Sequence, residues 1–475
     1  MMPNSLKYIL LLTLSAAGHA LLPRKLRNGF LLGVSWLFYL LSMPQYLPLM
    51  IGVTAATYLT ARWMEDHPSQ KRPALTAALA ACFGLLFLYK YLAFAGSLLS
   101  KLPGVGTIEL PRLVQPLGIS FYLFCVTGYL IDVYRGAAAE KSLVDYSLMV
   151  SFFPAVLSGP IARSGHLLPQ LKERTPNWMD VKRGITRFLV GMAKKMLLAD
   201  VLSALVALVY ADVTAFTGTQ VLFATVCYAL QIYCDFSSYS DMAVGAGLLF
   251  GIRLMENFDT PYFAQSIPEL WRRWHISLSS WFRDYLYFPL GGSRRGMLRT
   301  NLNLLIVFAV SGLWNGAGTQ FLVWGLLHGG YQVIGRTVRP LTKPLREKLD
   351  ASPLSLPAAW LRMGWVFLLT TVAWVFFRAD SVGHALAVFR QIGTLGEFGG
   401  AEAFGMVRPQ LILLGICLGA LFVWDLTCKR YDLVERLARR VWLRWVVWTV
   451  LLLAVLCFGA YGTGYNAAEF VYFQF

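Results

Sequence analysis

Charged residues are scarce in this chain of 475 residues. Asp, Glu, Lys and Arg make up 14% of the sequence, whereas soluble domains carry roughly 25%. Hydrophobic residues make up 57%, with 31 Phe and 15 Trp among them. This balance excludes a soluble globule. Apolar runs recur along the whole chain, and at about 20 residues per crossing they predict an all-α polytopic membrane protein with about 10–12 transmembrane helices.

Motifs for several kinds of chemistry are also missing. The seven cysteines form no C-x-x-C pair and no Cys/His set at zinc spacing, so we expect neither a metal site nor a disulfide framework. The glycine-rich loop that begins at Gly291 lacks the Walker A spacing of a nucleoside-triphosphate site. No G-x-S-x-G elbow is present, which argues against a serine hydrolase. The sequence also shows no internal repeat and no separate soluble domain.

Negative charge is the scarcer sign, with 25 acidic against 42 basic residues and a formal net charge of +17. No nucleic-acid-binding module accompanies this excess, so we expect no nucleic-acid partner. In a membrane protein, Lys and Arg gather in short cytoplasmic loops, beside anionic membrane lipids. Two late basic stretches, 336–348 and 429–444, fit this pattern.

Two histidines frame the segment from Phe258 to Gly330. His275 lies in a basic, aromatic run, and His328 lies in an otherwise apolar run. Burying an ionisable side chain at membrane depth costs free energy, so such a residue predicts a functional site.

The run around His275 is amphipathic if it forms one helix from Trp271 to Phe288. One face would carry Trp271, Trp274, Leu278, Trp281, Phe282, Tyr285 and Phe288, and the other Arg272, Arg273, Ser280, Arg283 and Asp284. This pattern is typical of a helix at a membrane interface. His275 falls at the edge of the apolar face, as either a functional residue or a satisfied interfacial histidine. The arginines suit lipid phosphate or the phosphates of coenzyme A.

His328 is the sharper candidate for chemistry. It shares a helix face with Trp324 and Tyr331, while Gly325 and Gly329 form a G-x-x-x-G pair that predicts close approach of another backbone. A desolvated imidazole there stays neutral and is available as a general base. The alternative is a helix–helix hydrogen bond.

Two interruptions occur between the apolar runs. Pro154 and the Gly159-Pro160 pair interrupt the apolar run 146–168, a break of the kind tolerated where backbone is buried in protein or lines a cavity. The run 231–242 carries two carboxylates and three serines. We expect Asp235 to line a polar pocket and Ser240 or Asp241 to cap a helix that continues toward Phe250.

Several stretches resemble the membrane-bound O-acyltransferase family, in its bacterial alginate O-acetylation branch. They are 117–122 (LGISFY), 131–136 (IDVYRG), 158–161 (SGPI), 231–242, 256–258 (ENF), 269–292 with its RRWH run, 324–329 (WGLLHG) and the closing 470–475 (FVYFQF). The resemblance covers nearly the whole chain.

The resemblance implies one membrane-embedded domain over residues 1–475. It would comprise N-terminal helices in 1–113, a catalytic core in 114–335 and C-terminal helices in 336–475. The expected fold is a helix bundle with re-entrant or interfacial segments around a central channel. In the family this channel meets at a catalytic histidine, which matches His328 here, and a second family position matches His275.

One motif departs from the family. Bacterial relatives usually read Leu-Trp-His-Gly where this chain has Leu313-Trp314-Asn315-Gly316. Asn315 can hydrogen-bond a substrate but cannot take a proton. The residues expected to bind donor or substrate, beside the catalytic pair His328 and His275, are Arg272, Arg273, Trp274, Arg283, Asp235, Asn315 and Trp324. No metal and no bound cofactor are expected.

The resemblance also implies a mechanism in the bacterial inner membrane. A cytoplasmic acyl thioester, acetyl-CoA, would enter from the inner face, and His328 would act as general base on an acceptor hydroxyl or on a residue of a partner. His275 would orient the thioester or stabilise the oxyanion. The partner would be an extracytoplasmic protein that acetylates a polysaccharide such as alginate or a cell-wall glycan.

Three other functions remain open at this point. The first is D-alanyl transfer to teichoic acid from a carrier-protein thioester, which the aromatic run cannot distinguish from acetyl transfer. The second is a transporter or flippase, although such proteins commonly show paired halves and this sequence shows none. The third is a structural scaffold, which leaves both histidines unexplained.

Overall fold

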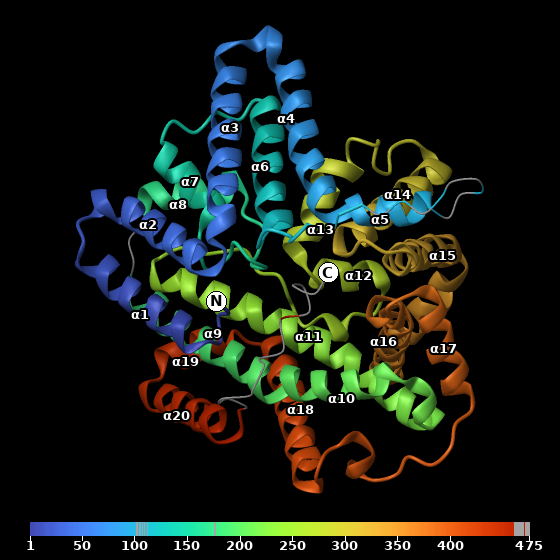
Figure 1. The fold of residues 1–475 in the computed structure, drawn as a ribbon. Coiled ribbons are helices and arrows are strands. Elements are labelled where there is room, and N and C mark those ends of the chain that lie inside the picture. Colours follow the sequence, from blue (N-terminus) through green and yellow to red (C-terminus); the bar gives the residue numbers. More distant parts are fainter. Residues whose placement is uncertain are drawn as a thin grey trace. The chain divides into compact units, whose positions relative to one another are not determined.

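The described part of the chain is helical throughout (Figure 1). A computed structural model describes residues 1–100, 103, 106, 108, 110, 111, 113–174, 177–459 and 470. The one β-type pairing within these residues is an isolated antiparallel bridge between Phe258 and Trp274. The predicted all-α class is confirmed. Of the closing stretch 470–475, all but Phe470 lies outside the described residues.

The chain forms two compact units, and the first comprises Met1–Gly191, Tyr239–Glu256 and Leu437–Arg444. Its helices are α1 (Leu6–Leu21), α2 (Arg24–Ser42), α3 (Leu47–Asp66), α4 (Lys71–Leu86), α5 (Leu92–Leu99), α6 (Ile119–Tyr134), α7 (Leu143–Ser151), α8 (Ser164–Glu173) and α9 (Trp178–Ala193). Aromatic rings pack its centre: Phe153 lies 5.8 Å from Tyr8 and 6.0 Å from Phe250, between ring centroids. The break expected at Pro154 and at Gly159-Pro160 is confirmed, since both lie between the end of α7 and the start of α8.

The second unit comprises Met192–Ser238, Asn257–Arg436 and Trp445–Phe475. Its helices are α10 (Asp200–Ala211), the first part of α11 (Gly218–Leu249), α12 (Ile267–Arg273), α13 (Ile276–Phe282), α14 (Gly296–Asn315), α15 (Thr319–Asp350), α16 (Ser355–Arg378), α17 (Val382–Gly393), α18 (Arg408–Cys428), most of α19 (Leu433–Arg439) and α20 (Val441–Phe458). Short π-helical turns occur in both units, at Phe87–Tyr91 in the first and at Lys194–Ala199 and Arg283–Tyr287 in the second. Single 3₁₀ turns occur at Pro44–Tyr46, Pro68–Gln70, Val213–Ala215, Pro261–Phe263 and Ala401–Phe404.

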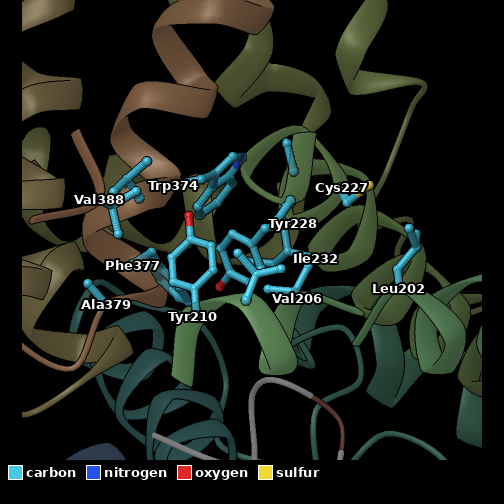
Figure 2. Packing of buried hydrophobic residues seen from close by; sticks show 14 of the residues in the cluster. Leu202, Val206, Tyr210, Cys227, Tyr228, Ile232, Trp374, Phe377, Ala379 and Val388 are labelled. Carbon is cyan, nitrogen blue, oxygen red and sulfur yellow. The ribbon is translucent and has the colours of Figure 1, made fainter. Parts of the chain in front are cut away.

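The core of the second unit is built from α10, α11, α16 and α17 (Figure 2). Side chains from these helices are almost fully buried, among them Leu202, Val206, Tyr210, Cys227, Tyr228, Ile232, Trp374, Phe377 and Val388. Close-packed apolar and aromatic surface of this kind resists displacement. It fixes α16, and therefore the indole of Trp374, which also borders His328.

Six of the described helices are long and apolar enough to cross a membrane. They are Pro68–Leu99, Gly218–Leu249, Gly296–Asn315, Ser355–Arg378, Arg408–Cys428 and Val441–Phe458, and two shorter apolar helices are Leu6–Leu21 and Ile119–Tyr134. The chain is therefore a multi-pass membrane protein. The number is smaller than the sequence count because some apolar runs form shorter helices, such as Leu6–Leu21 and Ile119–Tyr134, and another is divided between α7 and α8.

The helix cap expected at Ser240 or Asp241 is wrong. Both residues lie inside α11, which runs without interruption from Gly218 to Leu249. Asp241 accepts hydrogen bonds from Arg187 of α9, at 2.9 Å from Nε and 2.7 Å from the nearer terminal nitrogen. This ion pair allows a carboxylate in the interior of a mostly buried helix, where an unpaired charge would be costly.

The first late basic stretch is helical rather than a loop. Arg336, Arg339, Lys343, Arg346 and Lys348 all belong to α15, the helix that also carries His328. The helix is buried around His328 and exposed on every side from Ile334 to Lys348.

Candidate active site

His275 occupies a break between two short helices. The single helix expected from Trp271 to Phe288 is wrong, because α12 ends at Arg273, α13 begins at Ile276, and a π-helical turn follows at Arg283–Tyr287. His275 has φ 45° and ψ 54°, in the left-handed region, which few side chains other than Gly, Asn and Asp adopt without strain. A strained residue of this kind persists only where its surroundings hold it.

Asn257 provides that support. Its backbone oxygen accepts a hydrogen bond from the Ile276 amide at 3.0 Å. Its side-chain oxygen accepts from the Ser277 amide at 3.2 Å and from the Ser277 hydroxyl at 2.7 Å. Asn257 is fully buried, so these bonds form away from competing water and fix the start of α13.

The side chain of His275 lies inside the protein rather than at an interface. It is 1% exposed, and its ring lies 4.6 Å from Phe236 and 5.9 Å from Trp314, between centroids. His275 lies outside the six candidate membrane-spanning helices, and burial lowers the pKa of its imidazole to about 3. The ring is therefore neutral at physiological pH.

His328 lies in an aromatic enclosure. Its side chain is fully buried, and the rings of Trp271, Trp324, Tyr331 and Trp374 lie 5.1, 5.2, 5.9 and 6.3 Å away, between centroids. The enclosure draws on α12, α15 and α16. Such surroundings exclude water from the ring and strengthen any hydrogen bond that it makes.

One hydrogen bond identifies the protonation state of His328. The indole Nε1–H of Trp271 donates to Nδ1 of His328 at 3.3 Å. An indole nitrogen can only donate, so Nδ1 is the acceptor and the imidazole is neutral with its proton on Nε2. Nε2 is buried and has no hydrogen-bond partner among the described residues. A buried N–H group without a partner costs free energy, and this N–H can donate a hydrogen bond to a bound substrate.

The helix of His328 packs backbone to backbone against α14, as the G-x-x-x-G pair predicted. A Cβ added at Gly325 would lie 2.2 Å from the backbone oxygen of Phe308, and one at Gly312 would lie 2.2 Å from that of Phe321. Gly329 is less constrained, since its added Cβ would meet Leu305 at 3.2 Å. The close approach fixes the position of His328 along α14.

The two histidines are joined through α12. Trp271 of this helix bonds to His328, and Trp274 directly precedes His275. Trp274 also lies 5.1 Å from Trp374, which borders His328. Any movement of α12 therefore affects both imidazoles.

The residues expected to bind donor or substrate fall into three groups. Trp274 and Trp324 are buried in the aromatic core around the histidines. Arg273 is tied to Glu269 and Asp259 at 3.1 and 3.4 Å, and Arg283 pairs with Asp284 at 2.8 Å. Arg272 and Arg283 are exposed, so their guanidinium groups are accessible to an anionic donor.

Asn315 and Asp235 are both buried. Asn315 ends α14, directly after the Trp314 that contacts His275, and its amide nitrogen donates to the Ser311 oxygen at 2.8 Å. Asp235 forms an ion pair with Lys195 at 2.7 Å, and Lys195 also pairs with Asp200 at 3.0 Å. The sequence analysis did not predict these two ion pairs of Lys195. The signal for them was Lys195 itself, a cation within the apolar run 185–210.

No metal centre accounts for these side chains in the part of the chain that the structure describes. Three or more His, Cys, Asp or Glu side chains do not come close enough to hold an ion there. The buried imidazoles of His275 and His328 are neutral, and neutral imidazoles can form hydrogen bonds and transfer protons.

Comparison with known proteins identifies the family. Residues 131–372 match the family described as MBOAT, membrane-bound O-acyltransferase family. The chain is 37% identical over 419 residues to a probable alginate O-acetylase of Pseudomonas putida, covering 86% of this chain and 82% of that protein. It is 34% identical over 388 residues to a peptidoglycan O-acetyltransferase of Helicobacter pylori, covering 75% and 72%.

A more distant match is a teichoic acid D-alanyltransferase of Bacillus subtilis. It is 26% identical over 234 residues, covering 46% of this chain and 58% of that protein. The family model covers half of the chain and the first relative most of it, so the transporter and scaffold alternatives fall away. The chain is an acyltransferase and belongs to the membrane-bound O-acyltransferase family.

Proposed function

We propose that this acyltransferase moves an acetyl group from cytoplasmic acetyl-CoA to hydroxyl groups of an extracytoplasmic polysaccharide, in the bacterial inner membrane. The observation that carries the proposal is the neutral, fully buried His328, whose Nε2 has no hydrogen-bond partner among the described residues. The names of the two more similar relatives support the acetyl group and the glycan class, alginate or peptidoglycan.

In this mechanism His328 accepts the proton of the acceptor hydroxyl. The hydroxyl oxygen attacks the thioester carbonyl carbon, the carbon–sulfur bond breaks, and the leaving thiolate takes a proton from the imidazolium. Since Nε2 already carries the proton of the neutral ring, the accepting atom is Nδ1. The hydrogen bond from Trp271 must therefore break when the hydroxyl arrives.

His275 is assigned a supporting role in the same reaction. A buried neutral imidazole can donate one hydrogen bond to the oxygen that becomes negative as the carbonyl is attacked. The bonds from Asn257 hold its backbone before substrate arrives, and a prepositioned donor needs no reorganisation at the moment of reaction. Arg272 would bind phosphate of the donor at the exposed side of α12.

The partner is an extracytoplasmic protein that passes the acetyl group to the polysaccharide, or the polysaccharide itself. The chain needs no bound cofactor, because acetyl-CoA is consumed as a substrate. Lipids of the inner membrane would contact the apolar helices that are least buried in the protein, Pro68–Leu99, Arg408–Cys428 and Val441–Phe458.

Acetyl transfer in intact cells tests the proposal. We expect His328→Ala to abolish ester-linked acetate on the extracytoplasmic polysaccharide, at membrane levels matched to the wild type. His67→Ala is the control, since His67 is stacked on Trp63 at the end of α3 and should leave acetylation unchanged. Acetylation by His328→Ala at the wild-type level would overturn the mechanism.

D-alanyl transfer is the second candidate, and the teichoic acid D-alanyltransferase relative favours it. The two donors can be compared directly with the purified protein. We expect labelled acetyl-CoA to lose its acetyl group in the presence of the wild type and not of His328→Ala. Turnover of a D-alanyl carrier-protein thioester, with none of acetyl-CoA, would replace the acetyl proposal.

A further inference from the structure

The second half of α15 has no role in the reaction proposed above. From Ile334 to Asp350 it extends for about 25 Å at 1.5 Å per residue. Beyond Tyr331, its side chains lose the neighbours that bury the first half, and Ile334, Leu341 and Leu345 are 62%, 81% and 61% exposed.

Two opposite faces run along this half-helix. At 100° per residue, the apolar stripe consists of Ile334, Val338, Leu341, Leu345 and Leu349. The basic face, on the opposite side, consists of Arg336, Arg339, Lys343 and Arg346, whereas Lys348, near the end of the helix, lies at the edge of the apolar stripe. The two acidic neighbours pair loosely, Glu347 with Lys343 at 3.7 Å and Asp350 with Arg346 at 3.6 Å. The side chains of Lys343 and Arg346 remain 67% and 51% exposed.

Neither water nor hydrocarbon suits both faces. The basic face excludes insertion into the acyl-chain region, where each Lys or Arg is strongly disfavoured. The apolar stripe is equally out of place in bulk water, where it would expose a continuous row of aliphatic side chains. The boundary between headgroups and acyl chains accommodates both faces of such a helix.

The next helix supports this position. The first turns of α16 expose Trp360, Leu361 and Trp365, and a shallow apolar groove there is lined by Pro357, Trp360, Leu361, Gly364, Trp365 and Leu368. Tryptophan is enriched at membrane–water interfaces. Arg362 ties the two helices together through Asp350 at 2.8 Å.

We propose that the second half of α15 lies along the membrane surface and binds anionic phospholipid, with lipid phosphates on the basic face and acyl chains against the apolar stripe. An acidic protein would also meet the basic face. Lipid is favoured for three reasons. The apolar stripe consists of aliphatic side chains, and exposed tryptophans of α16 lie close to it in the chain. The first half of α15 is also buried in a protein that spans the membrane. A phosphate layer is therefore always within its reach.

Amide hydrogen exchange of the full-length protein in nanodiscs tests the proposal. One nanodisc contains phosphatidylcholine alone, and the other contains phosphatidylglycerol as a third of its lipid. We expect residues 334–350 to exchange about tenfold more slowly in the second nanodisc, and high salt to remove most of the difference. The readout does not depend on activity, so it stands apart from the proposed reaction.

Three variants make the test specific. Arg336→Gln, Arg339→Gln, Lys343→Gln and Arg346→Gln together should abolish the difference between nanodiscs. The control replaces four exposed basic residues elsewhere, Arg24, Lys25, Arg72 and Arg390, by Gln. It has the same net charge and should keep the difference. Leu341→Ser with Leu345→Ser should also abolish it, since the acyl contacts are lost.

Several results would overturn the proposal. Equal exchange of residues 334–350 in the two nanodiscs would show that anionic lipid is not recognised. Loss of the difference in the control variant would show an effect of net charge alone. Slow exchange that appears only when a soluble protein fraction is added would assign this surface to a protein partner.

Discussion

At the scale of single residues, Trp271 decides which nitrogen of His328 is available. Its indole proton points at Nδ1, and the tautomer with a proton on Nδ1 would place two N–H groups against each other. In the resting state His328 can therefore donate a hydrogen bond from Nε2, whereas Nδ1 is already bonded to the Trp271 indole and cannot accept the proton of a substrate hydroxyl. Activation of the base requires a change at Trp271 rather than at the histidine.

Nitrogen-15 NMR of labelled histidine should detect this tautomer. We expect the His328 signals, assigned by their loss in His328→Gln, to show a protonated Nε2 and an unprotonated Nδ1. Trp271→Phe removes the indole N–H and keeps a ring, so both tautomers should become populated. Trp324→Phe is the control, since the ring of Trp324 lies 5.2 Å from the imidazole and its indole nitrogen makes no hydrogen bond to any described residue. A wild-type signal with its proton on Nδ1 would contradict the assignment.

His275 should make stability depend on pH. Its pKa is lowered to about 3 by burial, whereas an unfolded histidine titrates near 6.5. Below pH ~6.5 the unfolded chain therefore binds a proton that the folded chain does not, so stability is full above this pH and falls as pH falls toward 3. The slope is at most about 1.4 kcal/mol per pH unit.

The variant His275→Asn isolates this contribution. Asn tolerates the left-handed backbone and does not titrate. Between about pH 7.5 and pH 5, the wild type should lose roughly 2 kcal/mol more stability than the variant, measured from thermal unfolding in detergent. His67→Asn should keep the wild-type slope. Identical slopes for the wild type and His275→Asn would rule out a neutral buried imidazole.

At the scale of elements, the close packing of α14 against α15 depends on one glycine in each helix, Gly312 and Gly325. A methyl group at Gly325 would collide with the backbone of Phe308, which cannot rotate away as a side chain could. Gly330, one turn farther along α15, has open space where its Cβ would stand.

These two positions form a matched pair of substitutions. Gly325→Ala should destabilise the protein by about 1–3 kcal/mol, because the helices must separate to admit the methyl group. It should also lower acetyl transfer, since His328 lies one turn away. Gly330→Ala should be neutral or stabilising by up to ~1 kcal/mol, through helix propensity alone. Thermal unfolding of both variants checks this, and equal losses would show that the backbone contact is unimportant.

At the scale of the whole molecule, the proposed reaction has a direction. In the proposed reaction the donor and the acceptor enter from opposite sides of the membrane, so sealed vesicles of opposite orientation should differ. Inverted vesicles should consume external acetyl-CoA, and right-side-out vesicles should do so only after permeabilisation. His328→Ala vesicles provide the background. Equal consumption by both sealed preparations would exclude a cytoplasmic donor entrance.

The sequence predicted the features that depend on neighbours in the chain. Helix type, the break after α7 and the close approach at Gly325 follow from composition, proline and glycine within a few residues of each feature. The buried position of His328 followed from the apolar run around it. These are local properties, so one sequence is enough to show them.

The features that it missed are set by distant residues. The break at His275 depends on Asn257, which accepts hydrogen bonds from Ser277, 20 positions later in the chain. Asp241 lies inside a helix because Arg187, 54 positions earlier, neutralises it. Asp235 pairs with Lys195 across 40 positions. Hydrophobic periodicity and helix propensity contain no information on such distant pairs. One such pair can divide a run that has the pattern of a single helix.

The glycines of the α14–α15 hairpin also set a direction for movement. If α15 slid by one turn away from the hairpin turn, Phe321 would have to occupy the place of Gly325 against Phe308, where no side chain fits. Sliding by one turn toward it would bring Gly329 to Phe308 and Gly325 to Gly312, exchanging glycine for glycine. A one-turn slide of α15 away from the hairpin turn is therefore blocked at Gly325, three residues before the histidine of the proposed reaction.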